Sequence, residues 1–139
     1  MGLTVIDAGV IIAVLDREDA HHNAARESVA AARTRGDQLA VPASAYAEIL
    51  VAPLRAGSAH GAVVDDFLEA LPASVEPVSR EIARRAAELR AEHGSRVRLP
   101  DALVIATGVT LHADRILTTD ARWPEVNLPV ELVTGGGAL

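Results

Sequence analysis

The stretch Leu3-Thr4-Val5-Ile6-Asp7 is a short apolar run that contains Val and Ile and ends on a carboxylate. A run of this kind is typical of a strand buried in a parallel sheet. The pattern returns far along the chain in Ile116-Leu117-Thr118-Thr119-Asp120. We therefore expect two buried strands, each of which ends on an aspartate.

Further apolar stretches alternate with segments that favour helices. Pro53 is expected to stop one helix, and Ser79 is expected to cap another. This alternation predicts an α/β domain with a mainly parallel central sheet of four to five strands and helices on both faces. The remaining strands are expected at 39–41, 75–78 and 130–133, and the helices at 10–15, 20–35, 44–51, 57–71, 79–94 and 100–111.

Length and composition indicate one domain. The chain has 139 residues, of which 50% are hydrophobic, so it can bury a proper core. We expect the domain to cover 1–134 and a flexible, glycine-rich tail to follow at 135–139. There are no cysteines for disulfides or thiolate metal sites. No apolar run is long enough to span a bilayer and no basic region precedes Asp7, so we expect a cytoplasmic protein.

The charge pattern limits the possible chemistry. A net charge of −6 counts against binding nucleic acid through bulk electrostatics. All thirteen basic residues are Arg, which excludes any mechanism that needs a catalytic or phosphate-binding lysine. Arginine can still hold phosphate through two parallel hydrogen bonds.

Four acidic residues stand alone in otherwise uncharged, largely apolar stretches: Asp7, Glu48, Asp101 and Asp120. Desolvating an isolated carboxylate is costly, and the usual outcome is a raised pKa or a bound cation. Because four such sites occur in one small domain, we expect the four side chains to meet in space.

The positions expected for the four acids in the fold also place them close together. Asp7 and Asp120 follow strands, and ligands of open α/β sheets bind outside the carboxyl ends of the strands. Glu48 lies within an expected helix, and Asp101 follows Pro100 at the start of another. Clustered carboxylates must protonate or bind a cation, and Mg²⁺ and Mn²⁺ prefer oxygen ligands. Such a pocket suits phosphodiester cleavage, because the metal activates a water and neutralises charge on the phosphate.

In order and spacing, these acids resemble those of the PIN domain family, and more narrowly the VapC-type toxins of bacterial toxin–antitoxin pairs. The resemblance covers about residues 3 to 133. It implies a PIN-like three-layer fold and a Mg²⁺-dependent endoribonuclease, with Mn²⁺ as a substitute. It also implies a homodimer and a VapB-type antitoxin partner. The resemblance rests on Asp7 after Leu3–Ile6, Ala45-Tyr46-Ala47-Glu48-Ile49, Leu99-Pro100-Asp101-Ala102-Leu103, and Asp120 after Ile116–Thr119.

The resemblance also implies a role for each residue. Asp7 and Asp101 match the principal metal ligands of the family, while Glu48 and Asp120 match the further acids that complete the pocket. Thr118 matches a hydroxyl residue that supports the site by hydrogen bonding.

One departure from the family pattern lies directly after the first aspartate. Family members commonly carry small polar residues there, where this chain has Ala8 and Gly9. A supporting hydroxyl is therefore missing from these two positions, which bears on substrate positioning or rate and not on the acid set.

Each acid taken alone has an ordinary structural explanation. Asp7 could cap the helix that follows, and Asp101 could be a first-turn residue favoured by the helix dipole. Glu48 could face solvent from its helix, and Asp120 could be a turn residue. The solitary placement and order of all four favour the joint interpretation.

Other polar and apolar features have open alternatives. Arg96 and Arg98 could clamp an RNA phosphate or lie in a solvated loop. The pair His21-His22 is more typical of a surface than of a metal site. Apolar helix faces at 20–35 and 57–71 could form a dimer or antitoxin interface, with core packing as the default. Three aromatic residues are too few for a base-stacking platform: Tyr46, Phe67 and Trp123.

Two enzyme classes with acids at strand ends are disfavoured. A response-regulator receiver domain needs a lysine near its aspartate, and this chain has none. A haloacid-dehalogenase-type phosphatase needs a second aspartate at the position of Gly9. The remaining rival is a non-catalytic PIN-like binding module with a degenerate acidic pocket.

Overall fold

A parallel sheet of five strands runs through the molecule. The computed structural model describes residues 2–135, and its strands lie in the order β3-β2-β1-β4-β5. Every neighbouring pair is parallel. The mainly parallel sheet expected from the sequence is therefore confirmed. The strands are β1 (Leu3–Ile6), β2 (Gln38–Pro42), β3 (Ala73–Glu76), β4 (Arg115–Thr118) and β5 (Val130–Leu132).

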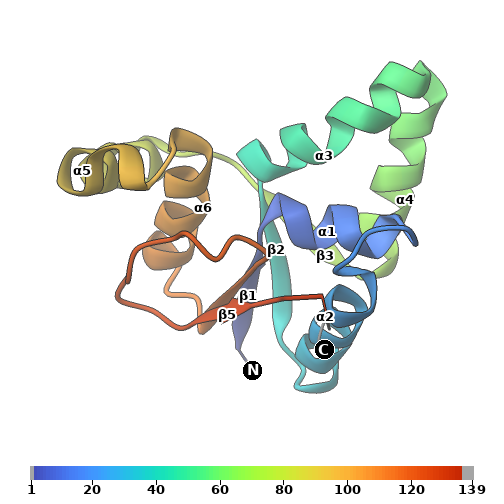
Figure 1. The fold of residues 1–139 in the computed structure, drawn as a ribbon, viewed down its shortest axis with the longest axis horizontal. Helices are drawn as coiled ribbons and strands as arrows, with labels where there is room; N and C mark the ends of the chain where they lie inside the picture. The colour runs from blue at the N-terminus through green and yellow to red at the C-terminus, as the bar shows by residue number, and fades with distance from the viewer. Residues whose placement is uncertain (1, 136–139) are drawn as a thin grey trace.

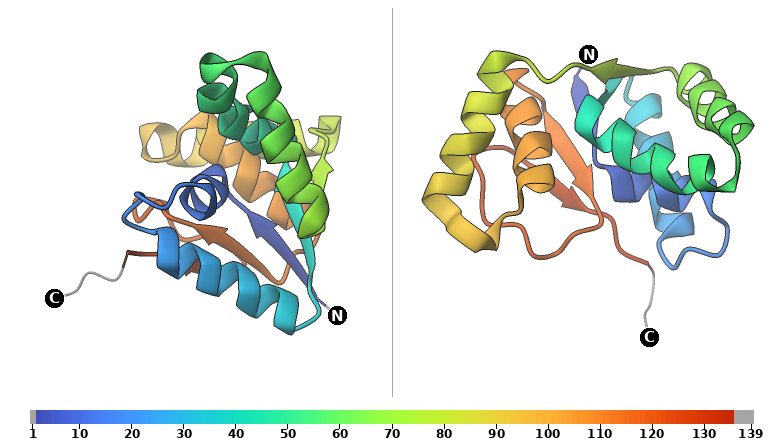
Figure 2. Two further views of the ribbon diagram at one scale, coloured as in Figure 1. Left: turned by 90° about the vertical axis from the view of Figure 1, so that its right-hand side faces the viewer. Right: turned by 90° about the horizontal axis from the view of Figure 1, so that it is seen from above.

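Helices cover both faces of this sheet. Figures 1 and 2 show α5 and α6 on one side and α1, α2, α3 and α4 on the other. This is the expected three-layer arrangement. The helices are α1 (Ala8–Leu15), α2 (His22–Thr34), α3 (Ala43–Ala56), α4 (Gly61–Ala70), α5 (Arg80–His93) and α6 (Leu99–Thr110), with short 3₁₀ turns η1 (Ser58–His60) and η2 (Gly94–Arg96).

The core lies between the three central strands, β2, β1 and β4, and the helices that cover them. Ile6 in β1 and Ile116 and Leu117 in β4 are completely buried. A Cβ atom at Gly108 would lie 2.7 Å from Ile116 Cδ1, so the glycine allows α6 to approach β4 closely. Close packing on both faces fixes β1 and β4 side by side, and with them the residues that follow each strand.

Pro53 does not stop α3, contrary to the sequence expectation. The helix continues to Ala56, and the Gly57 N–H donates to the Pro53 carbonyl at 3.2 Å. Leu54 in the extra turn packs against Gly61 at the start of α4. Tertiary packing therefore maintains a turn that the proline alone would disfavour.

The segment 57–71 is also divided differently from the expected single helix, since η1 precedes α4. The other elements lie within about two residues of their expected bounds, as is usual for helix and strand ends. Of the expected tail, 136–139 lie outside the described residues. Within 2–135, no helix has the length and hydropathy needed to cross a membrane.

Candidate active site

Asp7 connects the end of β1 to the start of α1. Its Oδ1 accepts the Ala8 N–H at 2.8 Å, so the side chain caps the helix. Its own N–H donates to the Leu117 carbonyl of β4 at 2.9 Å. Only 8% of Asp7 is exposed, and burial raises its pKa to about 6. The capping role is therefore real, but it leaves a buried carboxylate that retains its proton more readily than usual.

The Thr118 hydroxyl links the two strand ends. It donates to Asp7 Oδ2 at 2.7 Å and accepts the Asp120 N–H at 3.1 Å. Parallel pairing places Ile6 beside Leu117, which brings the residues after both strands to the same edge. Thr118 is itself buried, so it holds the Asp7 carboxylate in one orientation.

Glu48 and Asp101 approach this edge from two helices that pack against each other, α3 and α6. Partial burial raises the pKa of Glu48, and the charge of Asp101 raises it further. Burial also raises the pKa of Asp101, together with the charge of Asp120. The charges of Asp101 and Glu48 in turn act on Asp7. The four acids therefore form one electrostatically linked group.

Asp120 differs from the other three because it has a cationic partner. Arg122 Nε lies 3.1 Å from Asp120 Oδ1, and the Arg122 backbone N–H donates to the same oxygen at 2.8 Å. Partial burial alone would raise the pKa of Asp120, but the hydrogen bonds and charge of Arg122 outweigh it and hold the pKa below its ordinary value. Sequence reasoning missed this pair, although Arg122 lies only two residues beyond the aspartate.

The space beside Gly9 is filled by a hydroxyl from another strand end. A Cβ atom at Gly9 would lie 2.4 Å from Thr119 Oγ1. Thr119 therefore brings a hydroxyl to the position where the sequence lacks one. Sequence reasoning also missed Thr119, whose only signal is its place between Thr118 and Asp120.

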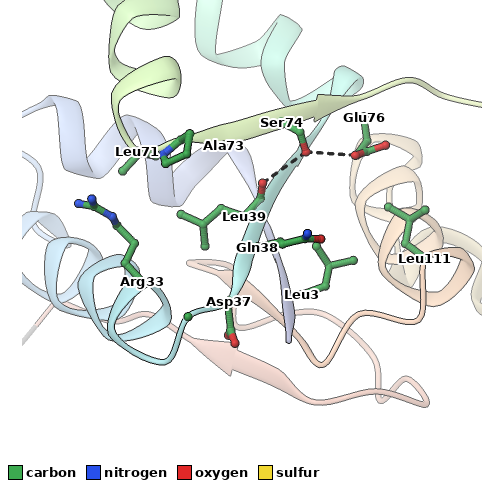
Figure 3. Close-up of a pocket in the computed structure, with 12 residues that line it drawn as sticks. Leu3, Arg33, Asp37, Gln38, Leu39, Leu71, Ala73, Ser74, Glu76 and Leu111 are labelled. Atoms are coloured by element: carbon green, nitrogen blue, oxygen red, sulfur yellow. Dashed lines mark hydrogen bonds between the residues drawn. The ribbon is translucent and has the colours of Figure 1, made fainter. Parts of the chain in front are cut away.

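A pocket of about 260 Å³ opens beside Asp101 and Asp120, and Arg98, Arg122 and Trp123 help to line it. A larger hollow of about 850 Å³ lies at the opposite edge of the sheet and contains none of the four acids. Figure 3 shows this larger hollow, in which the Ser74 hydroxyl is already within hydrogen-bond distance of the Leu39 carbonyl. The smaller pocket is the relevant one, because ligands of such sheets bind at the carboxyl ends of the strands.

The acid group suits a hard divalent ion. Its donors are all carboxylate oxygens, which Mg²⁺ and Mn²⁺ prefer. Within residues 2–135, no three His, Cys, Asp or Glu side chains are close enough together to hold one ion jointly. Mg²⁺ commonly uses one or two carboxylates and retains several waters.

The protein is therefore a three-layer α/β domain with a group of acids at the carboxyl edge of its sheet. The PIN domain family model matches residues 4–128, so this chain belongs to the PIN domain family. A sequence search of curated proteins finds no significant match.

Several solved structures share this fold. A chain of the Rickettsia felis VapBC2 complex, solved with a DNA fragment from its promoter, matches with a TM-score of 0.74 and 14% identity, over 94% of this chain and 98% of that one. Mycobacterium tuberculosis VapC20, a toxin that cleaves the sarcin–ricin loop, matches with a TM-score of 0.67 and 17% identity, over 81% of this chain and 86% of that one. FitAcB from Neisseria gonorrhoeae matches with a TM-score of 0.63 and 18% identity, over 92% of this chain and 96% of that one. At sequence identities this low, the structural similarity establishes a shared fold and nothing further.

Proposed function

We propose that this chain is a Mg²⁺-dependent endoribonuclease of the VapC type, which cleaves RNA phosphodiester bonds and is restrained by a VapB-type antitoxin. The observation that carries the proposal is the acid group at the carboxyl edge. Three of its members have raised pKa values: Asp7, Glu48 and Asp101. Burial is the main cause of each rise, and repulsion between the acids adds to it, so the group favours a bound positive charge.

Asp7 and Asp101 would hold the ion directly, and Glu48 and Asp120 would complete the site through water. When bound, Mg²⁺ or Mn²⁺ supplies a Lewis acid that activates water and offsets charge on the phosphate. Thr118 and the Ala8 N–H fix the two oxygens of Asp7. The orientation of this ligand is therefore set before any substrate binds, and the reaction requires no side-chain nucleophile.

Exposed apolar side chains on α1, α3 and α4 could contact an antitoxin. Val51 and Leu54 are each 48% exposed and Val63 is 60% exposed. Exposed apolar groups that occur together mark interaction surfaces. The apolar face at 20–35 packs in the core, which was the default interpretation, because α2 buries Ala25, Val29 and Ala32. We propose α1, α3 and α4 as the antitoxin-binding helices, and keep as a proposal the homodimer that the family resemblance implies.

The experiment that tests the activity is RNA cleavage by the purified protein freed of any antitoxin. We expect cleavage of a structured RNA in Mg²⁺ or Mn²⁺, and none with a chelator. Asp101→Asn should reduce the rate by at least about 100-fold, on the order seen when one transition-state stabilising group is removed. Asp66→Asn, which changes an exposed aspartate of α4, is the matched control and should retain full activity. Equal cleavage by Asp101→Asn and the wild type would show that the proposed mechanism is wrong.

A further inference from the structure

Three arginines surround the small pocket beside the acid group. Arg96 and Arg98 come from the segment between α5 and α6, and Arg122 comes from the loop after β4. Among residues 2–135, Arg96 and Arg98 make no ion pair with an acidic side chain. In a chain with a net charge of −6, a local group of guanidinium ions next to carboxylates is a distinct electrostatic feature.

These cations lie close to the carboxylates without neutralising all of them. Burial raises the pKa of Glu48, and the charge of Arg98 partly offsets this rise. Burial likewise raises the pKa of Asp101, and Arg98 and Arg122 oppose the effect. The pocket lining therefore brings three guanidinium groups and two carboxylates together.

Trp123, which also lines the pocket, carries a buried hydrogen-bond donor. The Trp123 indole Nε1 is buried and has no partner that meets the geometry of a hydrogen bond. Burial raises the pKa of Asp101, and the Trp123 N–H lies near enough to offset part of that rise. The contact between the Trp123 N–H and the Asp101 carboxylate does not meet the geometry of a hydrogen bond, so the indole donor has no partner.

We propose that this pocket binds a phosphodiester group of the RNA strand, next to the group that is cut. The inference rests on the proposed function and extends it to the substrate path. Arginine holds phosphate through paired hydrogen bonds. At about 260 Å³ the pocket is smaller than a typical small-molecule site of roughly 300–1,000 Å³, which suits one phosphate group.

Arg122 can take part because its side chain is largely exposed to solvent. Its side chain is 79% exposed in the pair with Asp120, and exposed ion pairs contribute little to stability. Movement of Arg122 to a phosphate would release Asp120 to face the cation. Binding of the strand and binding of the cation would therefore favour each other.

The test measures how salt weakens binding of a fluorescein-labelled oligouridine, with Ca²⁺ in place of Mg²⁺ to limit cleavage. For single strands, the slope of log K against log salt is about −0.7 per neutralised phosphate. We expect Arg98→Ala with Arg122→Ala to make the slope shallower by about 0.7 for each phosphate that the variant no longer binds. Arg84→Ala is the matched control, because it also removes an exposed arginine from an ion pair, with Glu88 on α5, and it should leave the slope unchanged.

An unchanged slope and affinity in the double variant, with its circular dichroism like that of the wild type, would overturn the phosphate site. The result is separable from the proposed activity. Arginine-dependent binding without cleavage in Mg²⁺ would support the site and refute the nuclease. Cleavage by a double variant with an unchanged slope would support the nuclease and refute the site.

Discussion

Asp7 combines two roles that oppose each other energetically. Its side chain caps α1 and accepts the Thr118 hydroxyl, but it is almost fully buried. Burial raises its pKa from 3.8 to about 6. At neutral pH the metal-free protein therefore holds an ionised carboxylate at a cost of about 3 kcal/mol at most, since one pKa unit corresponds to about 1.4 kcal/mol.

Asp7→Asn should stabilise the metal-free protein at pH 7, by up to about 3 kcal/mol. Asparagine can still cap α1, because its single carbonyl oxygen can accept the Ala8 N–H. Its amide NH₂ would then face the Thr118 oxygen as a donor, in place of the carboxylate oxygen that accepts the Thr118 hydroxyl. Because the folded-state pKa lies above the unfolded one, the contribution of Asp7 to stability is fully present below about pH 3.8 and is lost as pH rises through about 6. Urea unfolding in chelator should show the advantage of the variant shrinking from pH 7 toward pH 4. A constant difference across that range would show that Asp7 has no raised pKa.

The absence of a side chain at Gly9 is expected to be required by Thr119, because a Cβ atom at Gly9 would collide with Thr119 Oγ1. Gly9→Ala should lower the free energy of unfolding by about 1–3 kcal/mol through overpacking. Adding Thr119→Ala should restore most of that stability, because it vacates the same space. Urea unfolding of the single and double variants measures the coupling. Additive effects would show that the two side chains do not compete.

Ser79 illustrates how one residue fixes the start of an element. Its hydroxyl accepts the Ile82 N–H at 3.1 Å at the beginning of α5. Ser79→Ala should lower the free energy of unfolding by about 1 kcal/mol, whereas Ser79→Asn should preserve it. Equal thermal denaturation midpoints for Ser79→Ala and the wild type would exclude a capping contribution.

The elements that could be predicted are those with a local cause. Strand β1 follows from a short apolar run, and α5 follows from Ser79 and a helical pattern. The end of α3 could not be predicted, because packing of Leu54 against Gly61 maintains a turn beyond Pro53. That contact joins two segments whose meeting no local pattern encodes.

The same division applies to the candidate site. The four acids could be selected because each stands alone in an apolar stretch, and the structure places all four at one edge. Thr119 and Arg122 escaped prediction because their partners are set by loop geometry. The family resemblance supplied the proposed metal and reaction, which the residue pattern alone left among several possibilities.

The whole molecule brings distant segments to a single edge. Strands β1 and β4 are adjacent although 111 positions separate Asp7 from Thr118 in the hydrogen bond that joins them. Helices α3 and α6, which pack against each other, bring Glu48 and Asp101 close enough for their charges to act on Asp7. A binding module with an inert acidic pocket would have the same architecture, so cation binding and cleavage are the properties that separate the two functions.

Thermal denaturation with and without Mg²⁺ tests most directly whether the acids form one cation site. A ligand present at about 100 times its Kd stabilises the folded state by about 2.7 kcal/mol. We expect the wild type and the Asp66→Asn control to gain stability as Mg²⁺ rises to saturation. Asp7→Asn and Asp101→Asn should lack most of that gain, even though Asp7→Asn starts from a more stable metal-free state. Equal Mg²⁺ stabilisation of all four proteins, or none in the wild type, would contradict a cation site built from these acids.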